Sequence, residues 1–306
     1  MRKVIGIGET ILDILFKGGQ PTAAVPGGSV FNGIISLGRL GVNVSFISET
    51  GNDKVGDIIL NFMKENGVGT DHVNVFPEGK SPVSLAFLNE RNDAEYLFYK
   101  DYPRLRLDVT MPEISRDDIV MIGSYYAVTP QLRDKIKDLL DHARQQGAII
   151  YYDVNFRSTH KDEAIKLLPS ILENFEYADI IRGSVEDFEN MFALTDADKI
   201  YKSKLEFYCP RFICTHGGEN IRLYAKGLKK DYEVEPLQTI STVGAGDNFN
   251  AGVVFGLLKH RIRRDDLDDL SEEDWDNVIR CGKDFSANVC MSLSNSISKE
   301  FAAGYK

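Results

Sequence analysis

Short apolar runs alternate with segments of helical spacing along most of the chain. Val4–Ile7 has the composition of a buried strand, and residues 29–40 carry Val30, Ile34 and Leu37 at helical spacing before Gly41. The same alternation predicts further strands at 42–48, 119–122, 148–153, 179–181 and 212–215, and further helices at 53–66, 131–146 and 162–175. Such alternation predicts a mainly parallel sheet with helices on both faces.

Two segments interrupt this alternation. Residues 12–25 follow the first predicted strand without helical spacing, and residues 84–99 contain two strand-like runs, SLAFL and EYLFY, joined by the polar turn NERND. Strands inserted beside an α/β body are typical of a small lid over a cleft. Because no linker rich in Pro, Gly or Ser separates the parts, we expect one domain over residues 1–306 with a discontinuous β lid from about 12–25 and 84–101.

The charge balance disfavours whole classes of partner. Lys and Arg number 36 and Asp and Glu 46, a net charge of −10, whereas a protein that follows nucleic-acid phosphates needs a basic surface. No apolar run approaches the roughly 18 residues that a membrane-spanning helix requires. The four cysteines form no CxxC pair, as expected for thiols in a reducing compartment. We therefore expect a cytoplasmic protein without nucleic-acid or membrane partners.

The segment STVGAGDNFNAGVVFGLLKH, residues 241–260, carries the clearest chemical signal. Gly244, Ala245 and Gly246 precede a helical run, so several backbone N–H groups can converge where the helix contributes about half a positive charge. Asp247 follows in the first turn. It could act only as a helix cap, or as the base that phosphoryl transfer requires beside such an anion hole. GIGET near the start lacks the third glycine of a dinucleotide fingerprint, which weakens the alternative of a nicotinamide dehydrogenase.

Two motifs resemble one family. TVGAGDNFNAG resembles the C-terminal signature of the ribokinase-like (PfkB) sugar kinases, roughly DTxGAGDxFxAG. PGGSVFNGIISLGRLGVNVSFISETGNDKVGD, residues 26–57, resembles the family's GGxxxN segment, which precedes a helix, a strand and GxDxxG. The resemblance covers essentially the whole chain and implies a ribokinase-like three-layer α/β/α fold with a mainly parallel sheet and a small β lid.

The resemblance also implies catalytic and sugar-binding residues. Asp247 corresponds to the family's base, and its anion hole corresponds to Gly244, Ala245 and Gly246. The family's sugar-binding positions correspond to Asp13, Gly27, Gly28 and Asn32. These residue types suit a sugar, because a carboxylate accepts from adjacent hydroxyls, an amide both donates and accepts, and paired glycines let a ring approach the backbone.

Other candidates depend on shorter motifs. DVNFR resembles a DxNxR segment of fructokinase-like and ketodeoxygluconate-kinase-like members, so Asn155 and Arg157 are expected to face the phosphates or the sugar. In the predicted hairpin the aromatic residues, Tyr99 among them, either stack on a sugar or pack only within the sheet. Lys100 stands where members that phosphorylate ketoses or keto-acids often carry Arg. A lid that pairs with a second subunit would make a homodimer.

The nucleotide site is expected from three further segments. Glu186 matches the Glu of the family's NxxE motif, which orders magnesium through water, but Gly183 stands where Asn is usual, and Ser184 or Arg182 could compensate. CTHGGEN resembles a TxGxxG strand and turn, and an Ala-Asn pair resembles one near the adenine. These two segments imply contacts from Thr215, Gly217, Gly218 and Asn288. Ser241 stands where the family usually has Asp. The resemblance therefore leaves open whether this chain has a monovalent-cation site.

Together these features predict an enzyme that uses ATP and Mg²⁺ to phosphorylate a primary hydroxyl of a monosaccharide. Fructose is favoured by the DxNxR segment and the aromatic hairpin. 2-Keto-3-deoxygluconate, ribose and nucleosides stay open as substrates. A non-catalytic sugar or nucleotide sensor is the alternative from another class, suggested by Gly183 and Ser241.

Overall fold

The computed structural model describes residues 2–89 and 94–305 and contains two compact units. Each unit is assembled from segments that are distant in the sequence. The first unit comprises Met1–Lys3, Glu113–Pro236 and Val253–Lys283, and the second comprises Val4–Pro112, Leu237–Gly252 and Asp284–Lys306. The organisation as one domain with a lid stays a prediction.

The first unit is built on a sheet with strand order β13-β12-β11-β10-β9-β8. Strands β8 to β11 run parallel, whereas β12 and β13 are antiparallel additions. The strands are β8 (Ile119–Gly123), β9 (Ile149–Asp153), β10 (Ile180–Ser184), β11 (Phe212–His216), β12 (Asn220–Ala225) and β13 (Leu228–Glu233). Every residue of β8 and β9 is buried, as expected for parallel strands covered on both faces.

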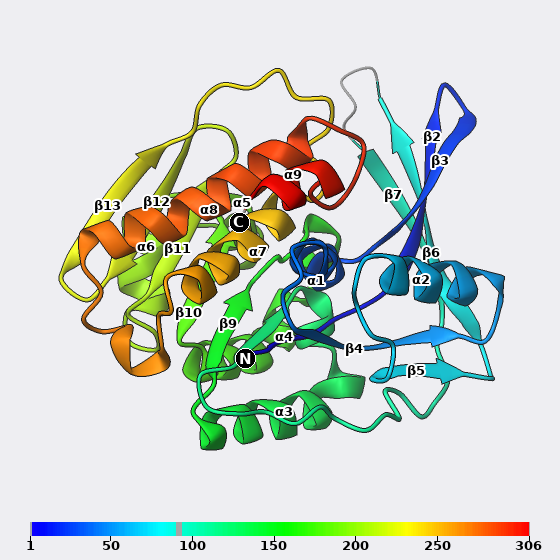
Figure 1. Cartoon of the computed structure of the whole chain (residues 1–306), viewed down its shortest axis with the longest axis horizontal. Coiled ribbons are helices and arrows are strands. Elements are labelled where there is room, and N and C mark those ends of the chain that lie inside the picture. Colours follow the sequence, from blue (N-terminus) through cyan, green and yellow to red (C-terminus); the bar gives the residue numbers. More distant parts are fainter. Residues whose placement is uncertain (1, 90–93, 306) are drawn as a thin grey trace. The chain divides into compact units, whose positions relative to one another are not determined.

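Helices flank this sheet (Figure 1). The helices of the first unit are α3 (Arg133–Gln146), α4 (Ala164–Tyr177), α5 (Val185–Phe192) and α6 (Ala197–Ile200). Two longer helices, α7 (Ala245–Lys259) and α8 (Glu272–Cys290), contribute residues to both units. Shorter turns of 3₁₀ or π helix lie at Tyr125–Ala127, Pro130–Leu132, Ser158–Glu163, Tyr201–Leu205 and Arg264–Asp266.

The second unit combines a parallel sheet with a separate four-stranded sheet. Strands β1 (Val4–Ile7), β4 (Val44–Gly51) and β5 (Val73–Phe76) are parallel. The other sheet has the order β3-β2-β6-β7 and stands beside β4 and β5 in Figure 1. Its strands are β2 (Ile11–Lys17), β3 (Gln20–Gly27), β6 (Lys80–Leu88) and β7 (Ala94–Asp101). The helices of this unit are α1 (Ser29–Arg39), α2 (Lys54–Glu65) and α9 (Lys299–Gly304).

The main sequence predictions of the fold are confirmed. The alternating strands and helices occur within a few residues of their expected bounds, and β6 and β7 form the predicted antiparallel hairpin. Residues 90–93 of the predicted NERND turn lie outside the described residues. The sequence reading did not include β5, β12, β13, α5, α6, α8 and α9. No helix within the described residues is long and apolar enough to cross a membrane.

Local sequence explains where the helices near the candidate site begin. Gly28, at φ 135°, precedes α1, and a Cβ there would lie 2.1 Å from the Glu9 carbonyl oxygen, so only glycine fits. Asp53 caps α2 by accepting from the Val55 and Gly56 amides at 3.0 and 2.9 Å. The Ser184 and Asp187 side chains form a capping box at the start of α5.

Candidate active site

Asp247 lies in the first turn of α7 and is held by side chains from α1. Its Oδ2 accepts from Asn32 Nδ2 at 2.8 Å, and its Oδ1 accepts from Ser29 Oγ at 2.9 Å. Only 7% of the residue is exposed. A carboxylate that merely capped α7 would not need these two donors, so the geometry favours a carboxylate oriented for chemistry over a simple cap.

Asn248 braces the turn that precedes Asp247 and was missed by sequence reasoning. Its buried Nδ2 donates to the carbonyl oxygens of Gly244 and Asn295, both at 2.8 Å, and its Oδ1 accepts from Ser36 Oγ. Gly244 has φ 78°, and a Cβ there would lie 2.9 Å from the Asn295 carbonyl oxygen. The turn therefore requires glycine and is fastened to α1 and to the segment after α8. An amide directly after Asp247 in an apolar helix was the available signal.

Asp13 is the third residue of β2 and lies beside Ser84 of β6 in the parallel register. Ser84 Oγ donates to Asp13 Oδ1. Burial raises the pKa of Asp13 to about 6; the negative charges of Asp247 and Glu9 add to this shift, and the Ser84 hydrogen bond opposes it. Asp13 is thus a carboxyl close enough to Asp247 to feel its charge.

Gly27 brings the backbone against these polar groups. A Cβ at Gly27 would lie 2.6 Å from Asp13 Oδ2 and 3.2 Å from Asn295 Nδ2. Asn32 is 4% exposed, and its Oδ1 has no hydrogen-bond partner among the described residues. A buried acceptor without a partner costs free energy unless a ligand fills it. We call Asp13, Gly27, Asn32, Asp247 and Asn295 the Asp247 cluster.

An ion pair adjoins the Asp247 cluster within the same unit. Lys100 Nζ lies 2.8 Å from Glu9 Oε2, and the Tyr102 hydroxyl donates to Glu9 Oε1. The Lys100 ammonium also lies 5.1 Å from the centre of the Phe98 ring. Sequence reasoning did not include Glu9, because its partners are distant in the chain.

The hairpin register separates its aromatic residues. Phe98 pairs with Ser84, which pairs with Asp13, so these three side chains share one face of the sheet. Tyr99 pairs with Val83, points to the opposite face and is 59% exposed. A sugar contact from Tyr99 stays a prediction. Phe98 lies on the Asp13 face, together with Tyr96, whose ring stacks on Phe98 with a centroid distance of 5.8 Å.

In the first unit, Arg182 connects the DVNFR and CTHGGEN segments at the carboxyl ends of the strands. Its Nη1 donates to Asp153 Oδ1 at 3.0 Å and its Nη2 to Thr215 Oγ1 at 2.6 Å, while its buried Nε has no partner among the described residues. Burial disfavours the charged guanidinium, but the carboxylates of Asp153 and Asp187 outweigh it and raise the pKa of Arg182. We call Asp153, Arg182, Asp187 and Thr215 the Arg182 cluster.

The predicted DxNxR and NxxE segments meet through Asp187. Its Oδ1 accepts from the Phe156 amide at 2.8 Å, between Asn155 and Arg157. Asn155 is buried with φ 38°, a left-handed conformation that is costly for a non-glycine residue, whereas Arg157 is exposed. Burial raises the pKa of Asp187 against the opposing charge of Arg182. Glu186 is exposed at the second position of α5, where its carboxylate can reach a ligand.

Gly183 stands where the resemblance to the family implies asparagine, and the packing around it favours glycine. A Cβ at Gly183 would lie 2.6 Å from Cε2 of the Phe188 ring. Any larger residue would therefore have to displace a fully buried aromatic side chain. Ser184 is engaged in the capping box of α5, so Arg182 is the neighbouring residue that keeps an open donor.

The remaining candidates are distributed over both units. In the first unit, Gly217 has φ 52°, and an added Cβ at either Gly217 or Gly218 would meet open space, so backbone is accessible there. In the second unit, Asn288 Oδ1 accepts from the Ser298 amide at 2.9 Å. Ser241 Oγ accepts from the Val243 amide at 3.2 Å. Roles for these residues in nucleotide or cation binding stay predictions.

The chain belongs to the pfkB family of carbohydrate kinases, whose family model matches residues 2–300. It is a phosphotransferase that acts on a sugar hydroxyl, which contradicts the dehydrogenase alternative. The chain is 29% identical over 249 residues to a 5-dehydro-2-deoxygluconokinase of Geobacillus thermodenitrificans (strain NG80-2), covering 76% of this chain and 72% of that protein. It is 27% identical over 262 residues to a fructokinase of Rhizobium leguminosarum bv. trifolii, covering 83% and 79%.

Solved structures show the same fold. A fructokinase double mutant from Vibrio cholerae O395, bound to fructose, ADP and potassium ion, aligns with a TM-score of 0.84 at 17% identity over 100% of this chain and 98% of that one. Aminoimidazole riboside kinase from Salmonella enterica aligns with a TM-score of 0.79 at 20% identity, over 99% and 98%. The ribokinase-like α/β fold predicted from the sequence is therefore confirmed.

Proposed function

We propose that this kinase transfers the γ-phosphoryl group of ATP to a primary hydroxyl of a monosaccharide, with fructose as the favoured substrate. The observation that carries the proposal is the pairing of Asp247 with Asn32. Asn32 gives its amide N–H to Asp247 and keeps its amide oxygen open. One side chain thereby fixes the base and offers an acceptor for a second hydroxyl of the same sugar.

Asp247 is the proposed general base. Its carboxylate accepts the proton of the attacking hydroxyl while the new O–P bond forms and the bond from the γ-phosphorus to the bridging oxygen breaks, which releases ADP. Ser29 and Asn32 hold the carboxylate in one orientation. The turn Gly244–Gly246 would stabilise the transferred group through backbone N–H groups and the helix dipole. The Ala245 amide also bonds to the Thr242 carbonyl oxygen at 3.2 Å.

The proposed sugar site uses Asp13, Gly27, Gly28 and Asn32. Above pH 6 the Asp13 carboxyl is mostly ionised and can accept from two adjacent hydroxyls, because its pKa is raised to about 6. The two glycines leave the backbone bare where a side chain would strike Asp13 or the Glu9 carbonyl oxygen. Shape and hydrogen bonding therefore suit a small polyol.

The proposed nucleotide contacts are Asn155, Arg157, Glu186, Thr215, Gly217, Gly218 and Asn288. Magnesium usually keeps several waters and takes one or two carboxylates besides the phosphates, which the exposed Glu186 carboxylate fits through water. When bound, the ion would neutralise charge on the phosphates. Arg182 Nη2 donates to Thr215 Oγ1 and thereby holds this side chain in place.

A homodimer is the proposed assembly. The β6–β7 hairpin exposes Phe87, Leu97 and Tyr99, which are 38%, 48% and 59% exposed. A second copy that covered these side chains would bury apolar surface. Sedimentation velocity would detect the dimer, and Leu97→Lys with Tyr99→Lys should convert it to a monomer.

The function is tested by ADP release with a panel of acceptors. Fructose, ribose, 2-keto-3-deoxygluconate and adenosine cover the substrates that stay open. We expect the highest kcat/KM with fructose, as the relatives named fructokinase suggest. ADP release with none of the four would contradict the proposal and favour the sensor alternative.

A further inference from the structure

We propose that Glu9 makes the sugar site selective for neutral sugars over sugar acids, by holding the Lys100 ammonium in an ion pair. The inference rests on the proposed function, because it concerns which sugars the same site accepts. Relatives of both kinds occur. One is named 5-dehydro-2-deoxygluconokinase, after a sugar acid, and another is named fructokinase, after a neutral ketose.

Lys100 is placed to meet a sugar bound at Asp13. In β7, Phe98 pairs with Ser84, and Ser84 pairs with Asp13. Because alternate residues of a strand share a face, Lys100 lies on the same side as these residues. Its ammonium lies 5.1 Å from the Phe98 ring centre, which confirms this direction. An unpaired ammonium at this position would attract a substrate carboxylate.

Glu9 already forms an ion pair with the Lys100 ammonium. Its Oε2 lies 2.8 Å from Lys100 Nζ, and its Oε1 accepts from the Tyr102 hydroxyl. Arg106, further along the chain, is also paired, since its guanidinium stacks 3.5 Å from the Tyr102 ring centre and binds the buried Glu49 carboxylate. Lys100 and Arg106 each face a carboxylate before any substrate arrives.

The balance of charge then opposes an acidic substrate. Asp13, Asp247 and Glu9 contribute three carboxyl groups against the single ammonium of Lys100. The negative charges of Asp247 and Glu9 both act on Asp13, so Asp13 lies within electrostatic reach of each of them. A substrate carboxylate would be repelled by these groups. It could form an ion pair with Lys100 only if the Glu9 carboxylate lost its own ion pair. A neutral polyol meets neither penalty.

The test compares kcat/KM for fructose and for 5-dehydro-2-deoxygluconate in the full-length protein. We expect the wild type to prefer fructose. Glu9→Gln keeps the shape of the side chain and a hydrogen-bonding partner for Tyr102 but releases Lys100, so the acid-to-fructose ratio should rise about tenfold to a hundredfold. Adding Lys100→Met to Glu9→Gln should abolish the gain. Glu95→Gln makes the same change of charge at an exposed residue of β7, the strand that contains Lys100, and should leave the ratio unchanged.

Three results would overturn the inference. These are equal use of both sugars by the wild type, an unchanged ratio in Glu9→Gln, or a gain that survives the loss of Lys100. Failure of the proposed function looks different, because no sugar would then release ADP in any variant. Calorimetric titration with the same two sugars decides the inference in that case: preferential binding of fructose, reversed towards the acid by Glu9→Gln, supports it, and any other pattern overturns it.

Discussion

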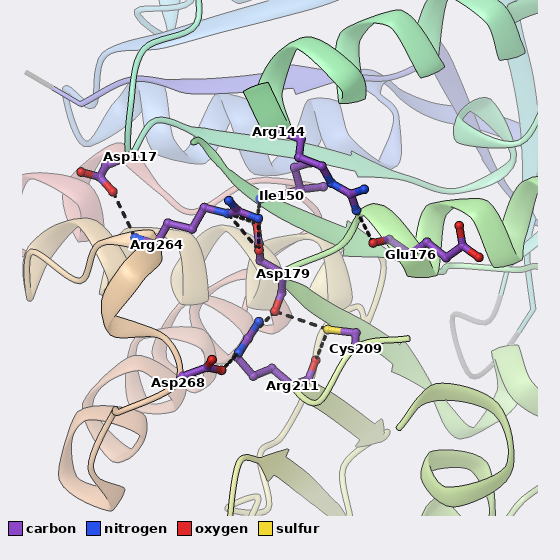
Figure 2. Close-up of polar contacts among 9 residues, drawn as sticks. All are labelled: Asp117, Arg144, Ile150, Glu176, Asp179, Cys209, Arg211, Arg264 and Asp268. Carbon is purple, nitrogen blue, oxygen red and sulfur yellow. Dashed lines mark hydrogen bonds and ion pairs between the residues drawn. The ribbon is translucent and has the colours of Figure 1, made fainter. Parts of the chain in front are cut away.

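The two ends of the parallel strands in the first unit both carry arginine–aspartate pairs with a buried aspartate, but they differ in how completely the hydrogen bonds of those pairs are satisfied. At the amino end, Asp179 precedes β10, and both its carboxylate oxygens accept from Arg264 Nε at 3.1 Å. Its Oδ2 also accepts from the Ile150 amide at 2.9 Å, and its carbonyl oxygen accepts from Arg211 Nε at 2.6 Å. Figure 2 shows these side chains converging on Asp179.

The outer members of this amino-end group are bonded as well. Cys209 Sγ lies 3.4 Å from the Asp179 carbonyl oxygen, Arg211 also binds Asp268, and the Arg264 amide donates to Asp117 at 3.1 Å (Figure 2). We call these six residues, Asp117, Asp179, Cys209, Arg211, Arg264 and Asp268, the Asp179 cluster. It ties the starts of neighbouring strands to the segment between α7 and α8.

The Arg182 cluster at the carboxyl ends is built from the same residue types but keeps open capacity. Arg182 Nε is buried without a partner among the described residues, and Asn155 holds a strained φ of 38°. Ligands of open α/β sheets bind at carboxyl ends. Neither a buried arginine–aspartate pair nor an open donor marks a site by itself, because Arg2, which binds the Asp117 carbonyl oxygen at the amino end, also has a buried Nη2 without a partner among the described residues. The position at the carboxyl ends of the strands distinguishes the Arg182 cluster. Variants of the two ends should accordingly separate activity from stability.

The largest effect is expected from Asp247→Asn in the second unit, which removes the base and keeps the shape. We expect kcat to fall by about 10²-fold to 10⁴-fold with a modest change in KM. Steady-state ADP release measures this change, and urea unfolding should show nearly unchanged stability. Near-normal turnover in this variant would contradict the proposal that Asp247 is the general base.

Asp179→Asn should have the opposite profile. It weakens the ion pair with Arg264 in a mostly buried setting, so the free energy of unfolding should fall by about 1–3 kcal/mol. We expect kcat/KM to stay within about twofold at a temperature where the protein is folded. A large loss of kcat/KM in folded protein would show that the Asp179 cluster also serves the reaction.

Arg182→Lys tests the carboxyl end of the same strand. Lysine keeps the charge but cannot reach Asp153 and Thr215 together, so we expect the KM for ATP to rise about tenfold with a smaller change in kcat. Arg264→Lys is the matched control at the amino end and should leave the KM for ATP unchanged. An equal KM for ATP in the two variants would show that the two ends of the strands do not differ in their contribution to ATP binding.

A dependence of sugar binding on pH is expected from Asp13. Because the pKa of Asp13 is raised to about 6, protonation below that pH removes an acceptor for sugar hydroxyls. At pH 5 about one carboxyl in ten is ionised, so the apparent dissociation constant for fructose should be about tenfold higher than at pH 7. Calorimetry across pH 5–8 measures this, and Asp13→Asn should bind weakly with a flat profile. A pH-independent wild type would show that Asp13 does not contact the sugar as a carboxylate.

Sequence reasoning located the parts of the site that motifs carry. The spacing of GGxxxN and GAGD pointed to Asn32 and Asp247, and the structure places these two side chains in direct contact. It could not find Asn295, which lies in an irregular segment and meets Gly27 only after folding. The pairing of Glu9 with Lys100 was hidden for the same reason, because strand register, which no local pattern specifies, brings them together.

The fold shows a similar division. Elements with strong apolar periodicity, such as α1 and β9, were predicted within a residue or two. Strand β13 alternates half-exposed and exposed residues at the edge of the sheet, and α8 has much polar sequence among its buried positions, so both were missed. Tertiary contacts decide such segments more than local propensity does.

Gly183 carries a consequence for how this chain can change over evolutionary time. Introducing an asparagine there in one step would drive its Cβ into the ring of Phe188. A smaller residue at 188 would have to come first, and that intermediate would leave a void in the core. The two positions are thus coupled, and a chain that acquires an asparagine at position 183 must pass through a less stable intermediate.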